Sequence, residues 1–112
     1  MRIGIPVAGG RCSSHFGRCE QFALVDADQQ SGQILGTEWV QTPPHEPGML
    51  PGWLAEQGVN VVITGGMGPR AQGLFARHGI AVVLGAAEAD PQELASQYLD
   101  GSLSSGQNIC DH

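Results

Sequence analysis

Residues 59–70, VNVVITGGMGPR, decide the fold of this 112-residue chain. The β-branched run Val59 to Thr64 is typical of a strand that is buried on both faces of a sheet. The run enters a glycine-rich turn, and Pro69 then stands where helices favour proline, in the first helical position. This stretch therefore predicts a buried strand, a tight turn and a helix, the repeating pattern of an α/β domain.

The alternation of strand and helix continues toward the C-terminus. Gly79 is a suitable residue to end the helix, and residues 80–84 form the last predicted strand. The stretch 90–93, Asp-Pro-Gln-Glu, has the N-cap, first-position proline and acidic third residue of a helix start. It predicts a third helix, followed by the Ser- and Gly-rich residues 101–112, which we expect to be a flexible tail.

The N-terminal half predicts an antiparallel meander and one helix. Its predicted strands are residues 2–7, 21–26 and 33–40. Pro6 indicates a strand end or an unpaired edge. The proline-rich residues 41–48 predict an irregular linker, and an apolar stripe predicts a helix over residues 50–57. The order βββαβαβα predicts one α/β domain over residues 1–100, with three helices and a mixed five-stranded sheet.

Composition and charge exclude several classes of protein. The chain carries five Lys+Arg against eleven Asp+Glu, and its basic residues are scattered, so we expect no nucleic-acid partner. Its apolar runs are of strand length, which predicts neither a signal peptide nor a membrane span, and we expect a cytoplasmic protein. Three cysteines, an odd number, favour thiols that are available for chemistry over a disulfide framework.

The glycine-rich loop after the first strand, residues 9–19 (GGRCSSHFGRC), gathers soft metal ligands. It holds Cys12, His15 and Cys19, and thiolate and imidazole suit iron, copper(I), zinc and metal-sulfur clusters. The two arginines of the loop would lower the pKa of a neighbouring thiol and offset the charge of an anionic cluster. Structural roles are the alternative, with Cys19 a small apolar core residue and His15 bonded to the backbone of a turn.

Two other segments add candidate site residues. The turn Gly65 to Gly68 precedes a helix whose first amides form a ready anion site, with Arg70 close by. It matches no nucleotide-binding motif, and a tight turn alone also explains its glycines. The strands before this turn and before the loop 9–19 are expected to be neighbours, so the two segments should converge. At the C-terminus, Cys110 and His112 could donate a thiolate and an imidazole, or the tail has no role.

Several of these elements together resemble the dinitrogenase iron-molybdenum cofactor biosynthesis family. They are residues 14–19 (SHFGRC) with Phe22, the turn 65–68 (GGMG) leading to Arg70, and the C-terminal Cys110-Asp111-His112. The resemblance covers about residues 1–100 and is to the small stand-alone members, because the chain lacks the CxxxCxxC motif of radical-SAM proteins. It implies a ribonuclease H-like fold with strand order 3-2-1-4-5, and cluster binding rather than catalysis.

We therefore predict a protein that is not an enzyme and that binds or carries an iron- or molybdenum-containing metal-sulfur cluster, with cluster-assembly or acceptor proteins as partners. The predicted cofactor-binding residues are Arg11, Ser14, His15, Arg18, Gly65, Gly66, Met67, Gly68 and Arg70. The predicted metal ligands are Cys12, His15, Cys19, Cys110 and His112. The alternative is an anion- or nucleotide-sensing module that uses only the helix start at Gly65 to Arg70. A metal-dependent nuclease is not expected, because the first strand carries no carboxylate.

Overall fold

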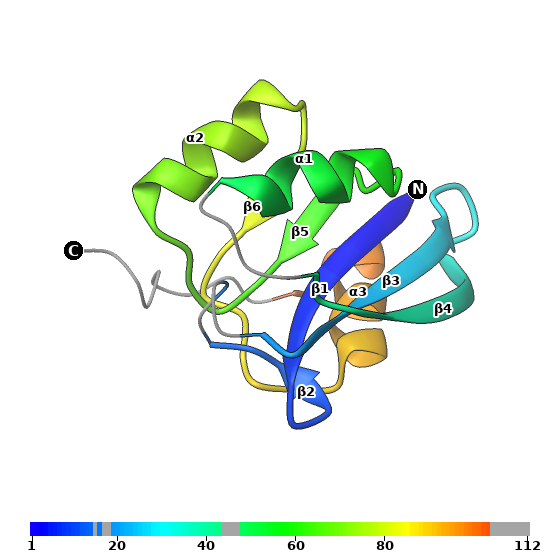
Figure 1. The fold of residues 1–112 in the computed structure, drawn as a ribbon. Coiled ribbons are helices and arrows are strands. Elements are labelled where there is room, and N and C mark those ends of the chain that lie inside the picture. The colour runs from blue at the N-terminus through cyan, green and yellow to red at the C-terminus, as the bar shows by residue number, and fades with distance from the viewer. Residues whose placement is uncertain (15, 17–18, 44–47, 104–112) are drawn as a thin grey trace.

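The computed structural model describes residues 1–14, 16, 19–43 and 48–103, which form one mixed sheet with helices on both faces (Figure 1). The strands are β1 (Arg2–Ala8), β2 (Arg11–Cys12), β3 (Gln21–Asp28), β4 (Gln33–Gln41), β5 (Val61–Ile63) and β6 (Ala81–Val83). The helices are α1 (Met49–Glu56), α2 (Pro69–Arg77) and α3 (Pro91–Asp100). The predicted α/β class and the three helices are confirmed.

The sheet has six strands, so the prediction of five was wrong. Its order is β4-β3-β1-β5-β6, and β2 pairs with β1 off this path. β1 is antiparallel to β3 and parallel to β5, which makes the sheet mixed. The extra strand β2 is only two residues long and folds back on β1 through Gly9 and Gly10, whose φ angles are 62° and 80°. So short a strand shows no periodicity in the sequence.

Pro6 lies inside the central strand β1, opposite Phe22 of β3, and not at a strand end or an unpaired edge as predicted. The carbonyl of Pro6 accepts from the amide of Ser13 at 2.7 Å, on the side of β1 where β2 folds back. Pairing of β1 with β5 has already ended at Gly4. Because proline has no N–H to donate, it can stand in β1 beyond the part that pairs with β5 without losing a hydrogen bond.

Helix starts follow the local signals of the sequence. α2 begins with Pro69, and Asp90 caps α3 by accepting from the amide of Gln92 at 2.8 Å. α3 is the longest helix at ten residues. Within the described ranges, no helix is long and apolar enough to cross a membrane.

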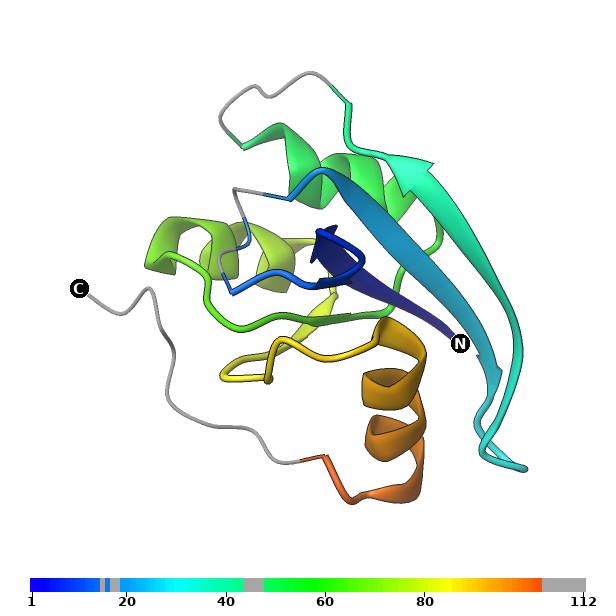
Figure 2. The ribbon, with the colours of Figure 1, turned by 90° about the horizontal axis from the view of Figure 1, so that it is seen from below.

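Two apolar clusters cover the two faces of the sheet. Figure 2 shows α1 and α2 on one side of the strands and α3 on the other. The cluster on the α3 face includes Ile3, Ile5, Val7, Cys12, Leu94 and Ala95. The cluster on the α1–α2 face includes Phe16, Phe22, Leu54, Met67 and Phe75. The loops after β2, β5 and β6 place Phe16, Met67 and Ala86 in these clusters and carry the candidate site.

Candidate functional site

The loop after β2 lies against the turn after β5, as predicted. The amide of Gly65 donates to the carbonyl of Ser13 at 3.2 Å, and the amide of Phe16 donates to the carbonyl of Gly66 at 2.9 Å. The hydroxyl oxygen of Thr64 lies 3.4 Å from the Ser13 carbonyl and 3.3 Å from the Gly66 carbonyl. Backbone and side-chain hydrogen bonds thus join the two segments.

A third loop, after β6, completes this junction. The amide of Gly85 donates to the carbonyl of Gly65 at 3.0 Å, and the amide of Ala86 donates to the carbonyl of Thr64 at 3.2 Å. Loops beyond the carboxyl ends of strands are where open α/β sheets bind ligands. Residues 85–86 were not predicted to belong to the site, and Thr64 was predicted only as the end of the strand before the glycine turn. For Thr64, the available signal was a polar residue directly after the apolar residues 61–63.

Gly65 is required by the close approach of two backbones. A Cβ atom added to it would lie 2.8 Å from the Cα of Ser14 and 3.3 Å from the carbonyl oxygen of Ala86. Gly68 differs, because nothing lies within 4 Å of a Cβ added there. Gly65 therefore serves the junction of the loops, whereas Gly68 stands in open space before α2.

The side chain of Phe16 anchors the loop to the core. It is 6% exposed, and its ring makes edge contacts with Phe22 at 5.8 Å and with Phe75 at 5.3 Å between centroids. Phe22 also contacts Trp53 of α1, at 5.7 Å. Phe16 is thus linked to α2 directly and to α1 through Phe22.

Cys12, a predicted metal ligand, lies in the cluster on the α3 face and is 2% exposed. Its Sγ is 3.7 Å from the Ser13 carbonyl and 3.9 Å from the Ile63 carbonyl. Burial raises the pKa of the thiol to about 11; a hydrogen bond from the Gly65 backbone opposes this rise and the Glu88 carboxylate adds to it. The group is therefore a neutral thiol near pH 7, whereas metals bind the thiolate.

Cys19, the second predicted thiol ligand, is half-buried on the opposite face of the sheet, where it packs against the α1–α2 cluster. Its Sγ is 3.5 Å from Thr42 Oγ1. Burial raises the pKa of this thiol too, and the hydrogen bond with Thr42 opposes the rise. The structure does not bring Cys12 and Cys19 together. The described residues contain no group of three or more His, Cys, Asp or Glu that could hold a metal ion.

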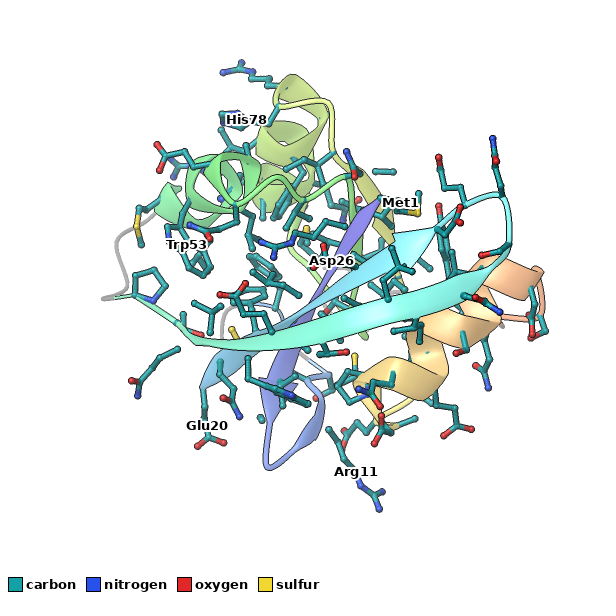
Figure 3. The ribbon with its side chains drawn as sticks, turned by 90° about the vertical axis from the view of Figure 1, so that its right-hand side faces the viewer. Met1, Arg11, Glu20, Asp26, Trp53 and His78 are labelled. Atoms are coloured by element: carbon teal, nitrogen blue, oxygen red, sulfur yellow. The ribbon has the colours of Figure 1, made fainter. Side chains whose placement is uncertain are left out.

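The two described arginines of the predicted site have different surroundings. Arg70 is exposed on the first turn of α2, two residues after Gly68. Arg11 points away from the sheet at the β1–β2 hairpin (Figure 3) and lines a cleft of about 370 Å³. The other charged residues of that cleft are Glu88, Asp90 and Glu93. Arg11 thus has acidic neighbours, and Arg70 is the arginine that adjoins the glycine turn.

The remaining predicted residues divide between core, surface and the part of the chain that is not described. Met67 is 1% exposed and belongs to the α1–α2 cluster, so its side chain is a core residue. Ser14 and Gly68 are partly exposed, and Gly65 and Gly66 are buried. The predicted ligands and cluster contacts His15, Arg18, Cys110 and His112 lie outside the described residues.

The fold and the site define a small α/β domain in which the loops after β2 and β6 meet at the glycine turn after β5. The chain belongs to the dinitrogenase iron-molybdenum cofactor family, whose sequence profile matches residues 1–101. It is 33% identical over 108 residues to MJ0580, an uncharacterized protein of Methanocaldococcus jannaschii, covering 92% of this chain and 89% of that one. The family prediction is confirmed, and it relates the chain to proteins linked to the iron-molybdenum cofactor.

Solved structures are similar over nearly the whole chain. The crystal structure of PH0822 has a TM-score of 0.85 and 31% identity, and the match covers 94% of both chains. The apo form of the orange protein from Desulfovibrio gigas has a TM-score of 0.74 and 25% identity, and the match covers 96% of this chain and 93% of that chain.

Proposed function

We propose that this chain is a non-catalytic protein that binds or carries an iron- or molybdenum-containing metal-sulfur cluster for cluster-assembly or acceptor proteins. Membership of the iron-molybdenum cofactor family supports this function. The observation that carries the proposal is the junction of Ser13 and Phe16 with Gly65 and Gly66. It joins the loop that contains His15 and Arg18 in the sequence to the turn that leads into α2.

The candidate ligands differ in how well they suit a cluster. Cys12 would have to leave the core and lose a proton whose pKa is about 11, so we propose that it is structural. Cys19 is only half-buried, and His15 belongs to the same loop, so these two are the donors that we propose first. Cys110 and His112 are proposed as additional donors.

Binding of an anionic cluster also requires positive charge near the glycine turn after β5. A sulfide cluster is anionic, and a chain with a net charge of −6 cannot attract it through its overall field. We propose that Arg70 and Arg18 supply local positive charge, together with the amides at the start of α2. Arg11 contributes less, because it shares its cleft with Glu88, Asp90 and Glu93.

The order of the five strands other than β2 supports the ribonuclease H-like fold that we propose for the domain.

Anaerobic reconstitution tests this function. The protein is incubated either with iron and sulfide or with thiomolybdate and copper(I), desalted, and assayed for bound metal and visible charge-transfer bands. We expect bound metal in the wild type, a weaker signal in His15→Ala and Cys19→Ser, and an unchanged signal in the control Cys12→Ala. Absence of bound metal from both mixtures would contradict the proposal.

A second candidate function is anion sensing at the start of α2. It is favoured by the raised pKa of both described thiols and by the exposed position of Arg70 next to the glycine turn. A thermal-shift screen with molybdate, phosphate and nucleotides separates the two functions. A shift that survives replacement of all three cysteines and is lost in Arg70→Ala would favour anion sensing.

A further inference from the structure

We infer that Thr64 is the positioning residue of the candidate site, because its buried hydroxyl holds the loop after β2 and the turn after β5 in one arrangement. The link from this arrangement to cluster binding rests on the proposed function. The arrangement itself is a property of the fold that is measurable without any ligand.

The hydroxyl of Thr64 is placed between the two segments. Thr64 is fully buried at 0% exposure. Its Oγ1 lies 3.4 Å from the carbonyl oxygen of Ser13 and 3.3 Å from that of Gly66, and its single hydrogen is shared between these two acceptors. A buried hydroxyl is tolerated when it is hydrogen-bonded, and here the bonds cross between two loops.

The backbone of Thr64 is fixed as well. Its amide donates to the carbonyl of Val83 at 3.0 Å, and its carbonyl accepts from the amide of Ala86 at 3.2 Å. The β-branched side chain of threonine has few χ1 rotamers, so a fixed backbone leaves the hydroxyl few alternative positions. Thr64 therefore contacts all three loops of the junction at once.

Both carbonyls that meet the hydroxyl also accept from a backbone amide across the junction. Gly66 O accepts from the Phe16 amide at 2.9 Å, and Ser13 O accepts from the Gly65 amide at 3.2 Å. Since C=O and the following N–H point to opposite sides of a trans peptide, holding these carbonyls fixes the planes of two peptide groups. One of these peptide groups joins Ser13 to Ser14 in the first loop, and the other joins Gly66 to Met67 in the turn before α2. Thr64 thus sets the orientation of the backbone on both sides of the candidate site.

Threonine offers a close pair of test variants. Thr64→Val keeps the shape and removes the hydroxyl, whereas Thr64→Ser keeps the hydroxyl and removes the methyl group. Ile63→Val is the matched control, because it trims the neighbouring buried side chain of β5 and leaves the hydroxyl in place. Thr64→Cys is a further variant, with a weaker donor of similar size.

Amide hydrogen exchange measured by NMR is the first test. In Thr64→Val we expect the amides of Phe16 and Gly65 to exchange about fivefold faster or more, the factor that corresponds to one hydrogen bond. The amide of Leu94 in α3, which donates to the carbonyl of the cap residue Asp90, is the reference. Its exchange rate should change only as far as the free energy of global unfolding changes. Thr64→Ser should restore slow exchange, Thr64→Cys should be intermediate, and Ile63→Val should match the wild type. Wild-type exchange of Phe16 and Gly65 in both Thr64→Val and Thr64→Cys would overturn the inference.

Metal binding to the same variants is the second test, with copper thiomolybdate as the probe. We expect Thr64→Val to bind about fivefold more weakly or worse, and Thr64→Ser and Ile63→Val to bind as the wild type does. If the amides of Phe16 and Gly65 exchange faster in Thr64→Val but its metal binding is unchanged, the role of Thr64 at the candidate site is overturned. If the wild type itself bound no metal in either reconstitution mixture, the proposed function would fail, and the exchange rates would still decide whether Thr64 positions the loops.

Discussion

Gly65 and Ser14 approach each other so closely that a Cβ atom on the glycine would lie 2.8 Å from the Cα of the serine. The atoms that this Cβ would meet belong to the backbone of Ser14 and Ala86, which cannot move aside as the end of a flexible side chain would. We expect Gly65→Ala to lower the free energy of unfolding by about 1–3 kcal/mol. Urea denaturation measures the change. Gly68→Ala is the control and should stay within about 0.5 kcal/mol, because that position is open. Equal effects of the two substitutions would show that the contact does not constrain the loops.

Gly73 lies in the middle of α2, and nothing lies within 4 Å of a Cβ added to it. Glycine in a helix interior is less favourable than alanine by about 0.5–1 kcal/mol. We therefore expect Gly73→Ala to stabilise the protein by that amount in thermal or urea denaturation. Gly79 is the matched control, because its φ angle of 71° is unfavourable for alanine. Gly79→Ala should destabilise by about 1 kcal/mol, and stabilisation by both changes would contradict this account.

The buried thiol of Cys12 makes stability depend on pH. Folding raises its pKa from the ordinary value of 9.0 to about 11, so between these pH values the folded chain keeps a proton that the unfolded chain releases. The free energy of unfolding should therefore fall as pH rises from 9 to 11, by on the order of 2 kcal/mol. Urea denaturation at several pH values measures this slope. Cys12→Ala should show a shallower fall, and an unchanged slope would argue against the buried thiol as its source.

Arg2 joins β1 to two carboxylates and to the C-cap residue of α1. Its Nε is 2.9 Å from Asp26 Oδ1, its Nη2 is 3.0 Å from Glu38 Oε2, and its Nη1 donates to the Gln57 carbonyl at 2.9 Å. The carboxylate side chains are 46% and 59% exposed, so water screens both pairs. We expect a loss of about 0.5–1 kcal/mol for Asp26→Asn and less for the more exposed Glu38→Gln. Both losses should shrink in 1 M salt; losses that are independent of salt would point to packing instead.

Phe16 places an aromatic ring from the first loop in the core cluster on the α1–α2 face. Phe16→Ala removes two edge contacts with other rings, and we expect it to lower the free energy of unfolding by about 3–4 kcal/mol. Phe16→Leu should lose less, because it still fills most of the site. Urea denaturation compares these variants. A loss below 1 kcal/mol for Phe16→Ala would mean that the ring does not anchor the loop.

The sequence was a good guide wherever the signal was local. Pro69 and Asp90 mark helix starts through their own backbone and side-chain chemistry, and the structure confirms both. The buried strand before Gly65 and the convergence of its turn with the first loop also followed from the sequence, because strand topology decides where loops meet.

The candidate ligands were harder to place, because burial depends on contacts between distant segments. Cys12 stands among glycines and polar residues, which indicates an accessible loop. In the structure its backbone pairs with Val7, and its amide donates to the Ala89 carbonyl at 2.9 Å. These contacts turn the thiol into the core. Met67 is a similar case, because it lies between two glycines of a turn and yet fills the cluster beneath α2.

β4 is a nine-residue strand at one end of the sheet order, and it carries the exposed side chains Leu35 and Trp39. A long edge with apolar side chains is a template on which further copies of a chain can pair and aggregate. Two features oppose such pairing. The register of β3 and β4 shifts between Asp26 and Ala27, an irregularity of the kind that bends a strand, and Glu38 places a charge on β4. These two features should therefore oppose aggregation in concentrated solutions of this protein. Replacing Glu38 by an apolar residue should lower the solubility more than it lowers the stability.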